Sequence, residues 1–325
     1  MNDWLMWGLP VIQFLQSLGD WLVKPMEFFS FLGREEFFLL VLPLLLWCVD
    51  VGLGVRAGVI LLASAGLNSA LKFAFGWPRP YWVSTEVKAW SGEGSFGAPS
   101  GHAQNAAALW GRLAVGWRRA WVRTTLILLV LLISLSRIAL AVHFPTDVVI
   151  GWLAGLAVLW AFVRLEQPLR QWLVSRGIGA KVLGAFLVSA LVLGIGLIAW
   201  KAGEGRPVPE SWAAMASAAR PQDDPIDPRS IGGLVGAGGT LFGLLGGAAL
   251  LEQWSGFNPG GPFWKRAVRY AVGAVGMVVL FFGLRAVLPT ADTALGQALR
   301  YLRYAAAGFW VSYGAPRLFV ALRLA

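Results

Sequence analysis

The chain has 325 residues, of which 57% are hydrophobic and 14% are charged, and its mean hydropathy is +0.65. This composition excludes a soluble globular domain, and the repeated apolar runs predict an all-α, polytopic transmembrane helical bundle. The net charge of +10 is expected from cytoplasmic loops and from contact with anionic headgroups, so membrane lipids and not nucleic acid are the predicted partners. The single cysteine, Cys48, excludes an intramolecular disulfide.

The predicted elements begin with residues 1–34, which are aromatic and apolar but are interrupted by Pro10, Asp20, Lys24 and Pro25. These interruptions favour helices that lie in the membrane interface over a helix that crosses the bilayer. Nine membrane spans are expected after this segment, at residues 37–49, 55–75, 99–117, 124–142, 145–165, 182–200, 231–251, 268–288 and 304–320.

Two features mark the second half of the chain. Residues 201–230 contain five prolines, which predicts an irregular loop. The span after it repeats glycine at every fourth position, at Gly239, Gly243 and Gly247, a pattern typical of close helix packing. The expected organisation is an interfacial N-terminal segment (1–34), a core helical bundle (35–200), an extracytoplasmic loop (201–230) and a C-terminal three-helix extension (231–325).

An odd number of spans places the termini on opposite sides of the membrane. The side away from the N-terminus carries 14 Lys and Arg but 3 Asp and Glu, many of them in short connections such as 117–123. Because positive charge in short loops marks the cytoplasmic side, the N-terminal side is predicted to face the periplasm or exterior. The 21 arginines against 6 lysines, with abundant Ala and Gly, are typical of a GC-rich bacterium and predict its inner (plasma) membrane.

Three polar clusters interrupt the apolar runs on this predicted outer side. They are KFAFGWPRP, with Lys72 and Arg79; PSGH, with Ser100, Gly101 and His102; and SRIALAVHFPTD, with Arg137, His143 and Asp147. Taken singly, the cations are explained by snorkelling to the interface and the aspartate by a favourable charge at a helix N-terminus. The chain has only two histidines, and both lie in these clusters. Charge at the end of an apolar run usually marks a site or a pair, so together the clusters predict one shared site.

The clusters have the composition that phosphoryl transfer without a metal requires. Lys72, Arg79 and Arg137 can supply fixed cationic donors to a phosphate dianion. The PSGH sequence opens a helix, so the amides of Ser100 and Gly101 are expected to point at an anion bound at that N-terminus.

The two histidines can then divide the remaining work. One would act as nucleophile and one as acid and base, with Asp147 as the candidate carboxylate that orients the nucleophile's tautomer. No cluster of Asp and Glu accompanies these residues, so neither a metal nor another cofactor is expected.

The three clusters resemble the signature motifs of the type 2 phosphatidic acid phosphatase superfamily. This superfamily includes lipid phosphate phosphatases, polyprenyl diphosphate phosphatases, glucose-6-phosphatase and the vanadium haloperoxidases. The resemblance covers about residues 37–165, and no motif residue departs from the pattern. The nine expected spans and the run Arg79-Pro80-Tyr81-Trp82 are similar to glucose-6-phosphatase.

The resemblance implies a role for each motif residue. His143 would attack phosphorus to form a phosphohistidine, and Asp147 would hold it. His102 would protonate the leaving oxygen and then activate the water that hydrolyses the intermediate. The phosphoryl oxygens would be bound by Lys72, Arg79, Ser100, Gly101 and Arg137.

The predicted function is that of a metal-independent membrane phosphatase acting on a lipid phosphate or polyprenyl diphosphate at the extracytoplasmic face. A phosphatase for a soluble sugar phosphate and a lipid phosphotransferase are alternatives. An anion or lipid transporter would place charges near the bilayer midplane, whereas this chain gathers them at span ends. The loops 76–98 and 201–230 are expected to shape substrate choice.

Overall fold

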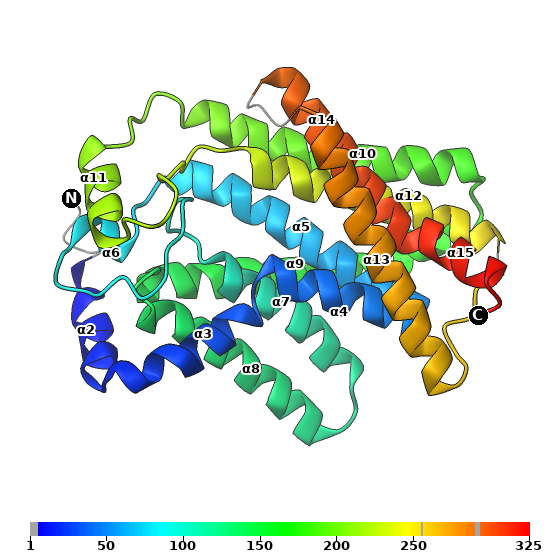
Figure 1. Ribbon diagram of the computed structural model, residues 1–325, viewed down its shortest axis with the longest axis horizontal. Coiled ribbons are helices and arrows are strands. Elements are labelled where there is room, and N and C mark those ends of the chain that lie inside the picture. The colour runs from blue at the N-terminus through cyan, green and yellow to red at the C-terminus, as the bar shows by residue number, and fades with distance from the viewer. Residues whose placement is uncertain (1–5, 255, 290–292) are drawn as a thin grey trace. The chain divides into compact units, whose positions relative to one another are not determined.

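The computed structural model describes residues 6–254, 256–289 and 293–325, and every regular element in these ranges is helical (Figure 1). The chain forms two compact units. Unit 1 comprises Met1–Phe37, Leu67–Ala161 and Gly196–Ile231, and unit 2 comprises Phe38–Gly66, Phe162–Ile195 and Gly232–Ala325. All residues of the three polar clusters therefore belong to unit 1.

Several helices are long and apolar enough to cross a membrane, in keeping with the requirement that the backbone satisfy its own hydrogen bonds in lipid. Within the described residues six qualify: α5 (Val51–Phe75), α8 (Ala120–Ala139), α9 (Pro145–Val174), α10 (Ile178–Ala202), α12 (Gly232–Trp254) and α13 (Phe263–Val287). The all-helical membrane fold is therefore confirmed.

The other three expected spans fall on shorter helices. They are α4 (Glu35–Cys48), α7 (Gly101–Gly116) and α14 (Ala294–Phe309), which continues through the π-helical turn η2 (Trp310–Gly314) into α15 (Ala315–Ala321). Each of α4, α7 and α14 is shorter than the ~20 residues of a straight span. A total of nine spans stays a prediction.

The N-terminal segment folds as α2 (Leu9–Ser17), the 3-10 turn η1 (Asp20–Leu22) and α3 (Val23–Phe31), and both α2 and α3 contact α8. Its large apolar side chains are partly turned outward, and Trp21 is 67% exposed. Exposed aromatic side chains on short helices suit the expected interfacial location.

Residues 201–230 differ from expectation because they contain the helix α11 (Glu210–Ala219), which packs on the short helix α6 (Pro80–Val83). The helix begins directly after Pro209 and has the alanine-rich sequence ESWAAMASAA. Alanine is the strongest helix former, and the prolines flank this stretch without entering it. The prediction of a wholly irregular loop was wrong for these ten residues.

Close contacts between glycine and a neighbouring backbone hold each unit together. In unit 1, a Cβ at Gly155 of α9 would lie 2.4 Å from the Gln104 carbonyl oxygen of α7. In unit 2, a Cβ at Gly243 of α12 would lie 1.9 Å from the Ala305 carbonyl oxygen of α14. Only glycine allows such approach, so the predicted packing role of the glycine repeat in α12 is confirmed.

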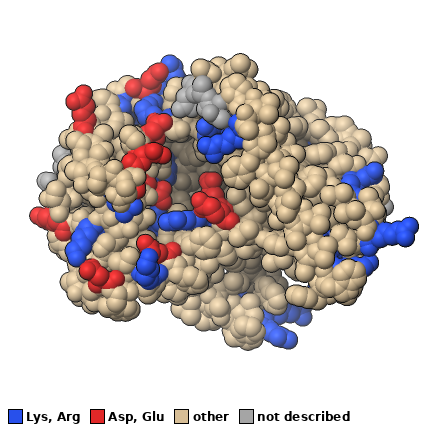
Figure 2. All heavy atoms as spheres, viewed as in Figure 1, with Lys and Arg blue, Asp and Glu red and all other residues tan. Residues whose placement is uncertain are grey.

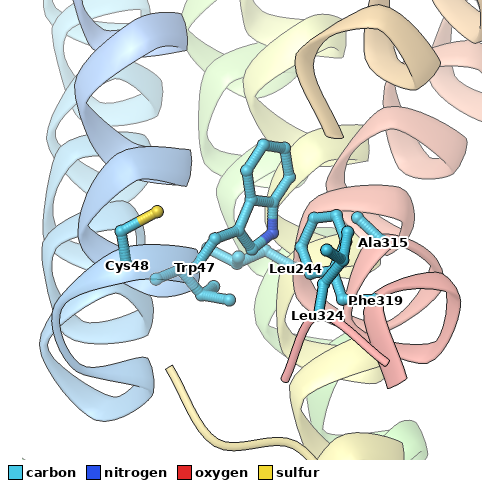
Figure 3. Packing of buried hydrophobic residues seen from close by; sticks show 7 residues of the cluster. Trp47, Cys48, Leu244, Ala315, Phe319 and Leu324 are labelled. Atoms are coloured by element: carbon cyan, nitrogen blue, oxygen red, sulfur yellow. The ribbon is translucent and has the colours of Figure 1, made fainter. Parts of the chain in front are cut away.

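The core of unit 2 is formed by Trp47 and Phe319 with smaller apolar side chains around them (Figure 3). The two rings meet edge to face, with centroids 5.5 Å apart. The Trp47 indole donates a hydrogen bond to the Val311 carbonyl at 2.8 Å, which satisfies its polar atom inside the core.

Charge is unevenly distributed over unit 1. Figure 2 shows Asp and Glu side chains gathered over the elements α6 and α11, with Lys and Arg among them. The polar clusters of the sequence lie in the same unit. The segments 76–98 and 201–230 meet in this part of unit 1, where α11 packs on α6.

Candidate active site

The end of α8 and the start of α9 carry Arg137, His143 and Asp147, and a tight reversal joins them. The His143 amide donates to the Arg137 carbonyl at 3.2 Å, and Ala141 adopts a left-handed φ of +59°. Pro145 is the first residue of α9, as expected, because an amide there would have no helical partner. The reversal leaves His143 at the N-terminus of α9, close to Asp147.

His143 is 1% exposed and lies between a cation and a carboxylate. Its Nε2 is 3.2 Å from Arg79 Nη1, and its Nδ1 is 3.4 Å from Asp147 Oδ2. A guanidinium can only donate, so Nε2 presents its lone pair to Arg79. In the neutral ring the proton is therefore on Nδ1, facing Asp147. The geometry of that second contact falls short of a hydrogen bond, although the separation is within ion-pair range.

Asp147 links the start of α9 to the start of α7. Its Oδ2 accepts from the Phe144 amide at 2.9 Å, and the Asp147 amide donates back to the Phe144 carbonyl at 3.0 Å. Its Oδ1 is buried and has no hydrogen-bond partner among the described residues. The Asp147 carbonyl accepts from the Ser100 amide at 2.9 Å.

The PSGH sequence opens α7 as expected, with Ser100 as the N-cap, whose hydroxyl accepts from the Ala103 amide. The expectation that the Ser100 amide points at a bound anion is wrong, because this amide donates to Asp147. The cause is the close approach of α9, where a Cβ at Gly151 would lie 2.7 Å from the Ser100 carbonyl oxygen. The Ser100 hydroxyl and the Gly101 amide remain as candidate ligands.

His102 lies in the first turn of α7, and its Nε2 is buried without a hydrogen-bond partner in the described part of the chain. Its ring is in contact with the backbone at Gly33, where a Cβ would lie 2.7 Å from Cδ2. Asn68 of α5 fixes the same turn, because its amide donates to the Pro99 carbonyl at 3.2 Å and to Gln104 Oε1 at 2.9 Å.

Lys72 and Arg79 are held by one serine in the loop before α7. Lys72 Nζ donates to Ser95 Oγ at 2.7 Å. Arg79 donates to the Ser95 carbonyl at 2.7 Å, to Ser95 Oγ at 3.1 Å and to the Phe96 carbonyl at 3.1 Å. Arg79 is completely buried, and these bonds fix its guanidinium plane next to His143.

Arg137 is completely buried at the end of α8 and is bound from two other elements. Its Nη2 donates to Glu93 Oε1 at 2.5 Å, and its Nη1 donates to the Ser30 hydroxyl of α3. Its Nε has no partner among the described residues. The N-terminal segment thus contributes contacts to the site through Ser30 and Gly33, which its expected interfacial role did not include.

The electrostatics of the cluster favour an anion and a neutral nucleophile. Burial, and then the charges of Arg79 and Arg137, hold the pKa of His143 well below its usual range. Partial burial alone would raise the pKa of Glu93, but the charges of Arg137 and Arg79 outweigh it and hold that pKa well below its usual range. The three cations Lys72, Arg79 and Arg137 outnumber the two carboxylates Glu93 and Asp147, and the resulting net positive charge attracts a phosphate.

The structure brings most of the predicted site residues into one connected set. Ser95 joins Lys72 to Arg79, Arg79 contacts His143, and His143 faces Asp147. Ser100 joins the set through the Asp147 carbonyl, and Gly101 follows it at the start of α7. Arg137 and His102 lie outside this set of direct side-chain contacts.

Sequence reasoning missed the residues that hold the motif side chains in place. They are Ser30, Gly33, Asn68, Glu93 and Ser95. Of these, only Glu93 gave a signal, because it is a charged residue between two glycines in a polar loop. No group of three or more His, Cys, Asp and Glu side chains that could hold a metal ion occurs among the described residues.

Two family models match the chain. The model described as the PAP2 superfamily matches residues 53–171, and the model described as the transmembrane extension of PAP2 superfamily phosphatases matches residues 235–325. The first match contains all three polar clusters. The second covers the last three expected spans, which the motif resemblance alone did not reach.

Several curated proteins are similar to the chain. A probable sphingosine-1-phosphate phosphatase of Dictyostelium discoideum is 35% identical over 30% of this chain and 24% of its own length. Human glucose-6-phosphatase 3 is 29% identical over 59% of this chain and 60% of its own length. Human glucose-6-phosphatase 2 is 25% identical over 73% of this chain and 74% of its own length. The chain thus spans about a quarter to three quarters of the length of these relatives. No solved structure matches it.

Proposed function

Because this chain belongs to the PAP2 superfamily, a superfamily of phosphatases, we propose that it is a membrane enzyme that hydrolyses phosphate esters through a phosphohistidine, without a metal ion. The observation that carries the proposal is the position of His143 between Arg79 and Asp147. Arg79 requires a lone pair on Nε2, and Asp147 suits a proton on Nδ1. That is the tautomer a nucleophilic imidazole needs.

The first half of the reaction transfers the phosphoryl group to the enzyme. A phosphoryl oxygen of the substrate accepts the Arg79 N–H that otherwise donates to His143 Nε2, and this frees the Nε2 lone pair to attack phosphorus. The P–N bond forms while the P–O bond to the leaving group breaks, and the leaving oxygen takes a proton from His102. The negative charge of the bound phosphate favours the protonated form of His102 in this step. Asp147 stabilises the positive charge that develops on His143.

The second half returns the enzyme to its starting state. His102, now neutral, takes a proton from a water molecule as that water attacks phosphorus. The P–N bond breaks, its electron pair returns to Nε2, and inorganic phosphate is released. One histidine thus acts first as acid and then as base, which microscopic reversibility requires of a two-step displacement.

Phosphoryl oxygens would be bound by the fixed donors around His143. The proposed ligands are Lys72, Arg79, Arg137, the Ser100 hydroxyl and the Gly101 amide. In the free enzyme Lys72 and Arg79 are tethered to the loop at Ser95 and need little reorganisation to meet a phosphate. Removing one such donor typically costs about 3–4 kcal/mol of transition-state stabilisation.

We further propose nine spans, with α4, α7 and the continuous helix α14 to α15 added to the six long apolar helices. This topology, with the positive charge of the short connections, puts the site on the periplasmic or outer side of a bacterial plasma membrane. It also supports the division into an interfacial segment (1–34), a phosphatase core (35–200), an extracytoplasmic loop (201–230) and a three-helix extension (231–325).

The proposed substrate is a phosphorylated lipid, which could be either a lipid phosphate or a polyprenyl diphosphate. The site is at helix ends, where a lipid headgroup lies while the lipid tail stays in the bilayer. The sphingosine-1-phosphate phosphatase relative supports a lipid monoester. A sugar phosphate is the second candidate, because the glucose-6-phosphatases match up to 73% of this chain.

The test is phosphate release by purified protein in excess EDTA from phosphatidic acid, a polyprenyl diphosphate, a sphingoid phosphate and glucose 6-phosphate. We expect release from at least one substrate, its loss in His143→Ala, and acid-labile ³²P labelling in wild type that is absent from this variant. Release that survives in His143→Ala would refute the proposal. Transfer of label to an added lipid would identify a phosphotransferase, and substrate flux into liposomes without phosphate release would identify a transporter.

A further inference from the structure

Glu93 brings a carboxylate into the cationic site and binds the guanidinium of Arg137. Its Oε1 accepts from Nη2 at 2.5 Å, and the Glu93 side chain is 31% exposed whereas Arg137 is fully buried. Carboxylate and phosphate oxygens use the same N–H edge of an arginine. In the free enzyme, Glu93 therefore holds a donor that a substrate phosphate would need.

The backbone of Glu93 is held in place by hydrogen bonds, so its side chain can rotate while the loop around it stays where it is. The Glu93 amide donates to the Tyr81 hydroxyl at 2.9 Å, and that hydroxyl donates to the Glu93 carbonyl at 3.0 Å. Tyr81 is 3% exposed and belongs to α6. Releasing Arg137 requires only rotation about the side-chain bonds of Glu93.

A cavity of about 220 Å³ adjoins Glu93, between the loop 92–94 and the segment 216–226 at the C-terminal end of α11. Its charged lining residues are Glu93, Arg220, Asp223 and Asp224. Arg220 is already bound by Asp223, with Nε 2.9 Å from Oδ2 and Nη2 3.1 Å from Oδ1.

The charged groups that remain available to a ligand in this cavity are therefore acceptors. With Arg220 engaged, the remaining negative charge lies on Glu93 and Asp224. Carboxylates accept hydrogen bonds and cannot donate them. A ligand group that fills this space must supply O–H or N–H donors, because an apolar group would leave the carboxylates desolvated and unpaired.

We propose that the substrate's phosphate displaces Glu93 from Arg137, and that Glu93 and Asp224 then bind hydroxyl or ammonium donors of the leaving group in this cavity. The inference rests on the proposed function and narrows its substrate class. The preferred substrate is a phosphate monoester whose alcohol carries such donors near the ester oxygen. A sugar phosphate and a sphingoid phosphate both have this chemistry, and a plain alkyl phosphate lacks it.

The test compares two matched substrate pairs on the full-length protein in detergent. Glucose 6-phosphate is paired with hexyl phosphate, and sphingosine 1-phosphate with octadecyl phosphate. The variants are Glu93→Gln and Asp224→Asn, with Glu86→Gln as a control, because Glu86 is an exposed carboxylate in the same loop, away from the cavity. Calorimetric binding of inorganic phosphate measures displacement independently of turnover.

We expect wild type to prefer the donor-bearing member of at least one pair by about tenfold or more in kcat/KM, because a bound analogue without donors would cover the two carboxylates and leave them unpaired. Which pair shows the preference separates the sugar from the lipid source. Glu93→Gln should reduce that ratio about tenfold and bind inorganic phosphate several-fold more tightly, because its neutral amide competes less for Arg137. Asp224→Asn should reduce the ratio without changing phosphate affinity, and Glu86→Gln should change neither.

Two results would overturn the inference. One is an unchanged substrate ratio in both Glu93→Gln and Asp224→Asn, and the other is phosphate binding that is unchanged or weaker in Glu93→Gln. Failure of the proposed function is distinguishable, because it would abolish release from all four substrates. Calorimetry would still decide whether Glu93 competes with phosphate.

Discussion

Replacing Gly33 with alanine should impair the proposed acid–base histidine without touching a charged residue. A Cβ at Gly33 would lie 2.7 Å from His102 Cδ2 and 3.0 Å from Ile133 Cγ2. Ordinary contacts begin near 3.4 Å, so the imidazole must move by about 0.7 Å. Ile133 is fully buried and blocks the alternative shift of the new methyl group away from the ring.

The magnitude follows from the sensitivity of proton transfer to position. A misplacement of about 1 Å can cost ~100-fold in rate, so Gly33→Ala should lower kcat about 10- to 100-fold, or about 1.4–2.7 kcal/mol. KM should change little, because the atoms nearest to a Cβ at Gly33 belong to His102 and Ile133 and not to the cations proposed to bind phosphate. Gly205→Ala is the matched control, since no atom lies within 4 Å of a Cβ there.

The assay is steady-state phosphate release, measured in wild-type and His102→Ala backgrounds. If Gly33 acts through His102, the substitution should have no further effect once His102 is gone. Wild-type kcat in Gly33→Ala would refute the reasoning. An equal loss in both backgrounds would do the same, because it would point to a general structural defect.

Three further predictions concern the nucleophile, its carboxylate and the helix packing. In the NMR spectrum of protein with ¹⁵N-labelled histidine, the His143 ring should stay neutral from pH 8 to 6.5 and take a proton only well below ~6.5, because burial and Arg79 lower its pKa. The His143→Ala spectrum assigns the signal. A titration midpoint at or above 6.5 would contradict this prediction. Asp147→Asn should lower kcat by about 10²- to 10⁴-fold with the fold intact, because an amide does not hold the Nδ1–H tautomer; kcat within threefold of wild type would exclude the orienting role. Gly243→Ala should lower the free energy of unfolding by about 1–3 kcal/mol, because its Cβ would lie 1.9 Å from the Ala305 carbonyl oxygen. The control is Gly246→Ala, which should leave the melting temperature unchanged because no atom lies within 4 Å of a Cβ there.

Much of this protein was predictable because its signals are local in the chain. Apolar runs of membrane length predicted helices, since a bilayer leaves the backbone no other way to satisfy its hydrogen bonds. The glycine repeat in α12 predicted close contact with another helix, because glycine at every fourth position places small residues along one face of a helix. The clusters around His102 and His143 were visible because charged groups are costly at the ends of apolar helices.

What only the tertiary structure decided is how distant segments act on those clusters. The Ser100 amide is bound by Asp147 because α9 passes close to α7 at Gly151, and no pattern around Ser100 indicates this. Ser30 and Glu93 bind Arg137 from segments 107 and 44 residues away. Such contacts depend on how helices pack, and no local period of the sequence encodes helix packing. The sequence therefore indicated which side chains the proposed chemistry would use, while only the fold determined how they are positioned.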